Sequence, residues 1–278
     1  MMGTTSRNER STIWLGAFHG KDNFVVWWSG GGLSCVDTGI RNGYREKITS
    51  FSGFIHSLLV GKMAGLKRVV ITGGTGGLGK AIVHEFAGKG WDVVALGRTD
   101  LDLADNVSVP RFFEINPCDL LVCCAGMIRD VPLLRMAEEQ WDDVLSVNFN
   151  ASALCAAAAV PGMLAKGCGH VVFVSSYAAL HPAVGQAAYA TAKAALHGLA
   201  QELAHRHGKA GLRFNVVLPG FLETPMTESV SAKRKEEVRG IHCLGHFNTA
   251  AVAAGFIRYL EEELPYTSGQ VFSLDSRL

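Results

Sequence analysis

The chain has 278 residues, of which 48% are hydrophobic and 18% charged, a balance that can fill a core and that excludes disordered and collagen-like chains. Lysine and arginine total 26 against 25 acidic residues, so the net charge of +1 gives no electrostatic reason for nucleic acid or an anionic membrane to be a general partner. We therefore expect a folded protein of one large or two small domains that binds a small molecule.

Residues 1–62 differ from the rest of the chain. They carry 7 basic and 4 acidic side chains, are rich in glycine, and show no sustained period of 2 or 3.6 residues. We expect this segment to be a poorly ordered extension of unknown role. Residues 63–278, which begin at Met63, are expected to form the folded domain.

From Leu66 onward, short β-branched runs alternate with alanine- and leucine-rich stretches, the pattern of βαβ units with a parallel sheet. The runs are apolar on both faces, as strands covered by helices on both sides require. The predicted strands are residues 68–72, 92–96, 120–124, 170–175, 213–218 and 270–274, and the predicted helices are residues 78–87, 137–164, 188–205 and 249–263. We expect an α/β fold with a doubly wound parallel sheet of about six to seven strands.

The seven cysteines show neither paired spacing nor a Cys-x-x-Cys motif, which argues against a disulfide framework and against a metal site. This usage favours a reducing, cytoplasmic location. The longest nearly apolar run, residues 153–165, is shorter than the roughly 20 residues that a membrane-spanning helix needs, so no membrane partner is expected.

A glycine-rich turn joins the first predicted strand of this domain to the first predicted helix. Such a turn needs residues that tolerate positive φ, and the missing side chains let backbone N–H groups and the helix N-terminus approach a pyrophosphate. A merely flexible turn is the alternative, but the strand-turn-helix context favours dinucleotide binding in a Rossmann-like fold. The candidate cofactor-binding residues here are Thr72, Gly73, Thr75, Gly76, Gly77, Leu78 and Gly79.

The run TGGTGGLG resembles the TGxxxGxG pattern of the short-chain dehydrogenase/reductase family, and the resemblance covers about residues 66–275. The catalytic set of that family is matched in order by Asn148, Ser176, Tyr189 and Lys193. The resemblance implies that Asn148 positions a proton-relay water and that Lys193 also holds the nicotinamide ribose. Ser176 is preferred to its neighbour because 13 positions separate it from Tyr189, the spacing common in the family.

The spacing of Tyr189 and Lys193 explains their chemistry. They lie one helical turn apart, which places both side chains on one face of a helix. We expect the nearby ammonium to lower the pKa of the phenol, so that Tyr189 donates a proton when a carbonyl is reduced and accepts one when an alcohol is oxidised. Ser176 is expected to hydrogen-bond the substrate oxygen as negative charge develops on it.

The end of the second strand chooses between NAD and NADP in dinucleotide folds. Gly97 leaves no carboxylate to repel a 2′-phosphate and Arg98 offers a guanidinium, so NADP(H) is favoured over NAD(H). A solvated loop charge is the alternative for Arg98, and Asp100 keeps NAD open. The interval before the next strand is too short for the helix, strand and helix of family members, so we expect a shortened third βα unit. By resemblance Asp102 contacts the adenine.

The next strand ends in Cys123, Cys124, Ala125 and Gly126, where family members usually have Asn-Asn-Ala-Gly. The resemblance implies that Cys124, Ala125 and Gly126 line the cofactor, because small side chains let the backbone approach the nicotinamide ribose. Adjacent residues of a strand face opposite sides, so we interpret the cysteine pair as two buried thiols rather than as a redox switch.

The residues Pro219, Gly220, Leu222 and Thr224 resemble the PGxxxT element of the family, in which Leu222 contacts the carboxamide and Thr224 approaches the cofactor phosphates. The polar stretch that follows resembles a lid over the substrate. Its basic cluster, residues 233–235, either attracts a phosphopantetheine or CoA phosphate or is the solvated face of a helix, and we favour the second interpretation.

These features are most similar to the 3-oxoacyl-(acyl-carrier-protein) reductase branch of the family. We expect an oxidoreductase that transfers hydride between NADP(H) and a carbonyl or alcohol, with a small molecule or an acyl thioester as substrate. By resemblance it forms a homodimer or homotetramer. The alternatives are an NAD-dependent dehydrogenase of a sugar, steroid or hydroxyacyl-CoA alcohol and a non-catalytic dinucleotide-binding regulator. Tyr189 argues against a regulator, which has no need of a proton donor.

Overall fold

The computed structural model describes residues 13–19, 22–29, 32–37 and 65–277. The chain divides into two compact units, Met1–Ala64 and Gly65–Leu278. Each is described by itself. The expected boundary after residue 62 lies close to this division. Within the expected extension only residues 13–19, 22–29 and 32–37 are described, and the rest lie outside the described ranges.

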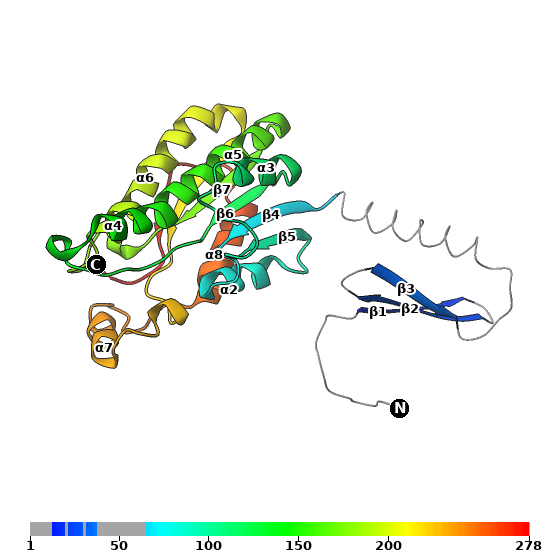
Figure 1. The fold of residues 1–278 in the computed structure, drawn as a ribbon, viewed down its shortest axis with the longest axis horizontal. Coiled ribbons are helices and arrows are strands. Elements are labelled where there is room, and N and C mark those ends of the chain that lie inside the picture. Colours follow the sequence, from blue (N-terminus) through cyan, green and yellow to red (C-terminus); the bar gives the residue numbers. More distant parts are fainter. Residues whose placement is uncertain (1–12, 20–21, 30–31, 38–64, 278) are drawn as a thin grey trace. The chain divides into compact units, whose positions relative to one another are not determined.

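In the first unit the described backbone forms a three-stranded antiparallel sheet, coloured blue in Figure 1. Its strands are β1 (Ile13–His19), β2 (Asp22–Ser29) and β3 (Gly32–Asp37), in the order β1-β2-β3. We expected no regular strand here, because polar and apolar residues do not alternate. The available signal was the glycine at positions 20, 30 and 31, between the strands, since glycine favours two-residue hairpin connections.

The second unit contains a six-stranded parallel sheet in the order β5-β4-β6-β7-β8-β9. All six strands predicted from the sequence are present. Their bounds are β4 (Lys67–Thr72), β5 (Trp91–Leu96), β6 (Leu120–Cys123), β7 (Gly169–Val174), β8 (Leu212–Leu218) and β9 (Val271–Ser273). Every neighbouring pair runs parallel, which confirms the doubly wound α/β fold.

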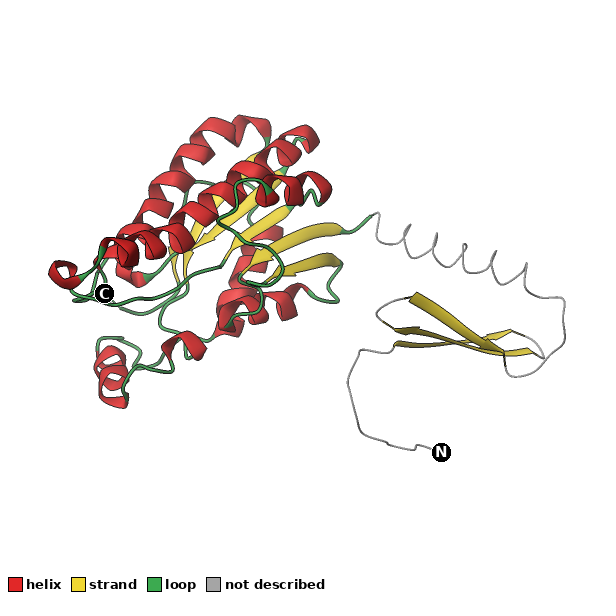
Figure 2. Cartoon of the chain, viewed as in Figure 1, coloured by secondary structure: helices red, strands yellow, loops and turns green. Residues whose placement is uncertain are grey.

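Helices cover both faces of this sheet (Figure 2). One face packs against α3 (Ser108–Ile115), α5 (Ala151–Lys166) and α6 (Ala187–His207), and the other against α2 (Gly77–Phe86) and α8 (Ala250–Glu262). A further helix, α7 (Ala232–Gly240), stands apart from these layers and is joined to them by the segments before and after it (Figure 1). Burial of the strands on both faces explains why they read as continuous apolar runs.

The third βα unit is shortened, as predicted. One helix, α3, lies between β5 and β6, and no strand is formed there among residues 97–119. The two strands β5 and β6 flank β4 on opposite sides, as in a complete doubly wound sheet, and the direction in which the sheet grows reverses at β4. In open α/β sheets, ligands bind at the carboxyl ends of the strands beside such a switch point.

Residues 138–166 form one helix with a π turn inside it. The turn, η2 (Ser146–Asn150), joins α4 (Glu138–Leu145) to α5. By length and composition the combined helix could cross a membrane. However, it buries apolar side chains such as Cys155 and Met163 against the sheet, as a core helix does.

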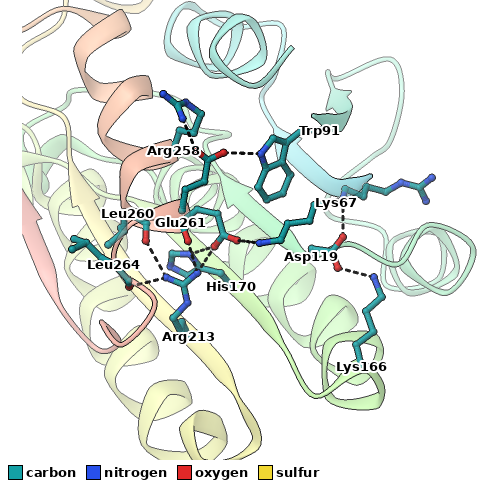
Figure 3. Close-up of polar contacts among 12 residues, drawn as sticks. Lys67, Trp91, Asp119, Lys166, His170, Arg213, Arg258, Leu260, Glu261 and Leu264 are labelled. Atoms are coloured by element: carbon teal, nitrogen blue, oxygen red, sulfur yellow. Dashed lines mark hydrogen bonds and ion pairs between the residues drawn. The ribbon is translucent and has the colours of Figure 1, made fainter. Parts of the chain in front are cut away.

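A buried ionic cluster holds the amino end of the sheet together (Figure 3). Glu261, near the end of α8, accepts hydrogen bonds from Lys67 Nζ at 3.2 Å, from His170 Nδ1 at 3.0 Å and from Arg213. Arg213 also donates to the carbonyl oxygens of Leu260 and Glu261 in the last turn of α8 and of Leu264 just beyond it. The last carbonyls of a helix have no partner within the helix. One carboxylate thus joins β4, β7 and β8 to α8.

The protonation state of His170 follows from its neighbours. The Asn215 side chain accepts from the backbone N–H of Gln270 at 3.0 Å, so its NH₂ group faces His170 Nε2, also at 3.0 Å. Nε2 must therefore accept, and the ring proton lies on Nδ1, which donates to Glu261. Burial lowers the pKa of His170, so the imidazole is neutral near pH 7.

Candidate active site

The glycine-rich turn forms at the carboxyl end of β4, where α2 begins. Gly73 has φ of 67°, and a Cβ there would lie 2.8 Å from the Cα of Ala125. A Cβ at Gly79 would lie 2.1 Å from the Gly73 carbonyl oxygen. Glycine is therefore required at both positions by the close approach of backbone to backbone.

The N-terminus of α2 suits an anion. Its N-cap, Gly76, offers no side-chain cap, and its first turn contains no acidic residue. The first N–H groups of a helix have no partner within the helix, and they lie at the positive end of its dipole. The turn residues Thr75, Gly76 and Gly77 are exposed or half-buried, so a pyrophosphate fits against this backbone. Leu78 instead packs toward the core under α2.

Thr72 lies at the carboxyl end of β4, beside the glycine-rich turn. Its side chain is buried, and its hydroxyl accepts hydrogen bonds from the backbone N–H groups of Cys124 at 3.1 Å and Ala125 at 3.3 Å. Both contacts cross from β4 to the end of β6. Thr72 therefore supports the segment of residues 124–126 rather than presenting its own side chain to a ligand.

The end of β5 lies beside this turn. A Cβ at Gly97 would lie 2.8 Å from Cγ2 of Thr75, which shows how closely the two turns pack. Asp100 folds back so that its carboxylate accepts from the Gly97 N–H at 2.7 Å. Arg98 is exposed and forms no ion pair among the described residues. A free guanidinium and a fixed carboxylate are therefore both present at this position.

Asp102 is exposed and caps its own turn. Its carboxylate accepts from the backbone N–H of Ala104 at 3.0 Å, just before α3. The flanking Leu101 and Leu103 pack against the core. The structure thus gives Asp102 a local role, and its contact with an adenine ring stays a prediction.

Asn148 lies in the π turn and is completely buried. Its amide clamps the backbone of Met127, accepting from the N–H at 3.2 Å and donating to the carbonyl at 2.9 Å, and it donates to the Val144 carbonyl at 2.9 Å. A Cβ added to Gly126 would lie 2.9 Å from Asn148 Oδ1 and 3.5 Å from Lys193 Nζ. Asn148 and Lys193 therefore meet at the end of β6, as the predicted set requires.

The two serines after β7 have separate tasks. Ser175 is buried, and its hydroxyl donates to the Lys193 carbonyl and lies 2.9 Å from His197 Nε2. The hydroxyl of Ser176 accepts from the N–H of Ala178, at 3.2 Å, in the short helix that follows, and it also hydrogen-bonds the phenol of Tyr189 in α6. Of the two serines, Ser176 is thus the one whose hydroxyl is left to meet a substrate.

Tyr189 and Lys193 lie on the same face of α6, with Nζ 5.9 Å from the centre of the tyrosine ring. Desolvation raises the pKa of Tyr189 to about 12, although a hydrogen bond to Ser176 acts in the opposite direction. Burial lowers the pKa of Lys193 to about 8, and its ammonium donates to the Val174 carbonyl at 2.9 Å. Burial therefore acts against the lowering of the phenol pKa that we expected from the ammonium, because the charged phenolate is costly to desolvate.

The loop after β8 approaches the glycine-rich turn. A Cβ at Gly77 would lie 2.6 Å from Cβ of Thr224, so these residues from opposite ends of the domain are in contact. Gly220 has φ of 83°, and the carbonyl of Pro219 accepts from Asn248. Leu222 is buried. Of the four predicted residues of this loop, Thr224 is the one that contacts the start of α2.

The cysteines at the end of β6 face opposite sides of the sheet, as expected. Cys123 belongs to the core under α5, and Cys124 packs toward the core under α2 and α8. Burial raises the pKa of Cys123 well above its usual value and that of Cys124 to about 11. Both groups are therefore protonated thiols at neutral pH, and a protonated thiol is a poor redox nucleophile.

The basic cluster of the lid lies on α7. Lys233 and Arg234 are exposed, and Arg234 pairs with Glu237 one turn later at 3.0 Å. Such a pair on the surface of a helix contributes little and is screened by salt. This geometry agrees with the solvated face that we favoured.

Two positioning contacts were missed in the sequence. Ser175 and His197 together hold the backbone of Lys193, and His197 follows Lys193 by four positions, so helical spacing was an available signal. Asp130 lies near enough to Tyr189 to raise the pKa of the phenol, and it accepts from Gln186 Nε2 at 3.1 Å. No sequence signal placed Asp130 there, because it lies in a loop of irregular structure.

Comparison with known proteins gives consistent relatives. A family model for short chain dehydrogenase matches residues 67–110 and 108–235. A 3-oxoacyl-[acyl-carrier-protein] reductase of Thermotoga maritima is 33% identical over 76% of this chain and 97% of its own length. A (3R)-3-hydroxyacyl-CoA dehydrogenase of Canis lupus familiaris is 36% identical over 64% of this chain and 73% of its own length. Among solved structures, a candidate NAD(P)-dependent gluconate 5-dehydrogenase of Beutenbergia cavernae with bound NADP at low occupancy matches with a TM-score of 0.73 and 28% identity, covering 76% of this chain and 95% of that one.

Proposed function

Because the chain belongs to the short-chain dehydrogenase/reductase family, and is thus an NAD(P)-dependent oxidoreductase, we propose that it reduces a 3-oxoacyl thioester or a similar ketone with NADPH. The names of the two relatives above both specify acyl thioesters that carry oxygen at carbon 3. One enzyme is named for the oxo form and the other for the hydroxy form. The shared chemistry is the interconversion of these forms.

The observation that carries the proposal is the convergence of Ser176, Tyr189 and Lys193 at the carboxyl end of the sheet, beside the switch point at β4. A nicotinamide cofactor supplies the hydride in this chemistry. The Tyr189 phenol, whose pKa is about 12, holds its proton at neutral pH and donates it to the substrate oxygen. The Ser176 hydroxyl stabilises the charge that develops on the same oxygen.

The residues that would hold the dinucleotide fit the group. The uncapped start of α2 would receive the pyrophosphate. Gly73 and Gly79 allow the tight backbone packing that forms this turn. Gly126, with no side chain beside Lys193, leaves room for a ribose at the end of β6. Thr72 and Asn148 hold this backbone in place from behind.

We further propose a preference for NADP(H), which the free guanidinium of Arg98 supports. The carboxylate of Asp100 supports the alternative, an NAD-dependent dehydrogenase of a 3-hydroxyacyl-CoA, because a carboxylate at this place can bind the ribose 2′-OH. A dinucleotide-binding regulator has no such support, since Tyr189 and Ser176 are arranged for proton transfer. A homodimer or homotetramer and a cytoplasmic location are proposals that rest on the family resemblance and the cysteine usage.

The test mixes the purified protein with acetoacetyl-CoA and NADPH or NADH and follows the absorbance of the reduced cofactor. The expected result is turnover with both cofactors and a lower KM for NADPH. The variant R98A is expected to raise the KM for NADPH about tenfold, because a charge-assisted hydrogen bond contributes about 1.5 to 3 kcal/mol, while the KM for NADH stays unchanged. Equal or better use of NADH by the unmodified protein would favour the alternative function, an NAD-dependent dehydrogenase of a 3-hydroxyacyl-CoA.

A further inference from the structure

The last described residues, Asp275–Arg277, run between three loops on the substrate side, and we call them the C-terminal strap. A Cβ at Gly220 would lie 2.8 Å from Cβ of Asp275, so the strap packs directly on the loop after β8. The N–H of Cys243, in the segment after α7, donates to the Ser276 carbonyl at 3.0 Å, and His242 forms an isolated β-bridge with Arg277. The strap therefore ties the lid segment to the body of the domain.

Arg277 is a buried cation with a fixed orientation. Its Nε donates to the Asp275 carboxylate at 2.8 Å and Nη2 donates to the same oxygen, while the two side chains are 8% and 1% exposed. A planar guanidinium held in this way cannot rotate to seek other partners. Asp275 thus determines where the flat face of the guanidinium lies.

That face lies on Tyr177. The guanidinium carbon is 3.5 Å from the centre of the tyrosine ring, and the ring of His181 stacks on Tyr177 with 4.7 Å between centres. Two groups this close to one ring centre cannot share a face without overlapping, so Tyr177 is held between Arg277 and His181. Cation–π contacts of this kind strengthen when they are shielded from water.

Tyr177 directly follows Ser176 in the chain. It opens the 3-10 helix η3 (Tyr177–Ala179), and the hydroxyl of Ser176 caps that helix by accepting from the Ala178 N–H. The direction of the Ser176 hydroxyl therefore depends on where η3 lies. A chain of contacts runs from Asp275 through Arg277 and Tyr177 to the catalytic serine.

We propose that Arg277 is a positioning residue for carbonyl reduction: with Asp275 it fixes Tyr177, and through η3 it holds the Ser176 hydroxyl toward the substrate oxygen. This inference rests on the proposed function, because Ser176 matters only if a carbonyl is reduced.

The test compares kcat in three variants. R277A removes the guanidinium, and Y177L removes the ring while leaving the buried ion pair intact, so it covers the case in which R277A fails to fold. Both are expected to lower kcat about 10- to 100-fold, since small misplacements of a catalytic group have effects of this size. The KM for NADPH stays unchanged. The matched control is R258A, which breaks the ion pairs with Glu85 and Glu262 at the other end of the domain and leaves kcat as it was.

The S176A background separates positioning from general structure. If Arg277 acts through Ser176, adding R277A to S176A lowers kcat no further. An equal loss in both backgrounds, or an unchanged kcat in Y177L, would overturn the proposal.

Amide hydrogen exchange provides a readout that needs no substrate. R277A is expected to speed exchange at the N–H groups of Ala178 and Cys243 and to leave that of Lys80 in α2 unchanged. If the unmodified protein reduces no ketone but these exchange rates rise in R277A, the proposed function is wrong, while the inference that Arg277 holds η3 in place is supported. Unchanged exchange at Ala178 would defeat the strap itself.

Discussion

The two ends of the parallel sheet use polar residues in opposite ways. At the amino end, Glu261, Arg213 and His170 are buried and satisfy one another's hydrogen bonds. At the carboxyl end, the hydroxyl of Ser176 and the first N–H groups of α2 keep bonding capacity that the rest of the domain does not use. We call the amino end of the sheet the closed end, because its polar groups bond one another. We call the carboxyl end the open end, because some of its polar groups keep free bonding capacity.

This difference separates stability from chemistry. A saturated cluster gains nothing from a ligand, whereas free donors and acceptors held on a rigid frame are ready to bind one. The same parallel strands serve both purposes, because their amino ends and carboxyl ends meet at opposite edges of the sheet. Substitutions at the two ends should therefore have separable effects.

The largest expected effect is at the open end. Y189F removes the proton donor and should lower kcat/KM for the ketone by about 10² to 10⁴-fold, because this is the usual contribution of a general acid. The free energy of unfolding, measured in urea, should change little. Tyr259, which is half exposed on α8, provides the control: Y259F should leave both quantities as they were. Full activity in Y189F would remove Tyr189 from the mechanism.

Breaking the closed end should do the reverse. E261A leaves the guanidinium of Arg213, which is 15% exposed, without its carboxylate, and loss of one partner of a buried ion pair costs about 3 to 5 kcal/mol. Urea unfolding should show this loss, while kcat per folded molecule is retained. E202A, which breaks an exposed pair with Arg206 on α6, should cost less than about 1 kcal/mol. Similar losses in the two variants would mean that the cluster does not stabilise the fold.

Raising the pH should affect the open end through Lys193. Its folded pKa of about 8 lies below the ordinary 10.5, so its charge is lost as the pH rises through 8. We expect kcat/KM to fall up to tenfold per pH unit above that value. Between pH 8 and 10.5 the unfolded chain holds the Lys193 proton more tightly than the folded chain does, so the contribution of Lys193 to the free energy of unfolding rises with pH. The expected fall in kcat/KM is therefore not caused by unfolding of the protein through loss of this proton. A flat profile from pH 7 to 9 would contradict the role of the lysine.

Lowering the pH should affect the closed end, with a smaller slope. Burial lowers the pKa of His170, so below about pH 6.5 the unfolded chain binds a proton that the folded chain does not, and stability falls. For Glu261 burial acts to raise the pKa, but the hydrogen bond from His170 and the charges of Arg213 and Lys67 lower it overall. Its contribution is therefore lost at still lower pH.

The measurement is the free energy of unfolding between pH 7 and 5 in the unmodified protein and in H170Q. In H170Q the free energy of unfolding should depend less steeply on pH than in the unmodified protein. The difference in slope should be up to about 1.4 kcal/mol per pH unit, which corresponds to one proton. Parallel curves would show that His170 does not titrate on unfolding.

The sequence was sufficient to predict the sheet, and it named a candidate catalytic set whose roles stay predictions. Apolar runs such as residues 213–218 are buried on both faces, so their pattern is unambiguous, and Tyr189 and Lys193 are placed by helical spacing alone. It was insufficient for roles that depend on contacts between distant segments. The pairing of Thr72 with the end of β6 and the fold-back of Asp100 depend on tertiary packing. The pKa of Tyr189 likewise depends on burial, which no spacing reveals.

The shortened third unit also has a consequence for how the protein behaves in concentrated solution. Because no strand follows β5 on its outer side among residues 65–277, the backbone N–H and C=O groups along that side have no neighbouring strand. Open strand edges are templates on which another chain can add a strand, and proteins commonly protect them with charge. The one charged residue of β5, Asp92, is paired with Arg68 of the inner neighbour β4 at 2.7 Å, so its charge is spent inside the sheet. The shortened unit thus leaves the outer edge of β5 open to strand addition by a second chain.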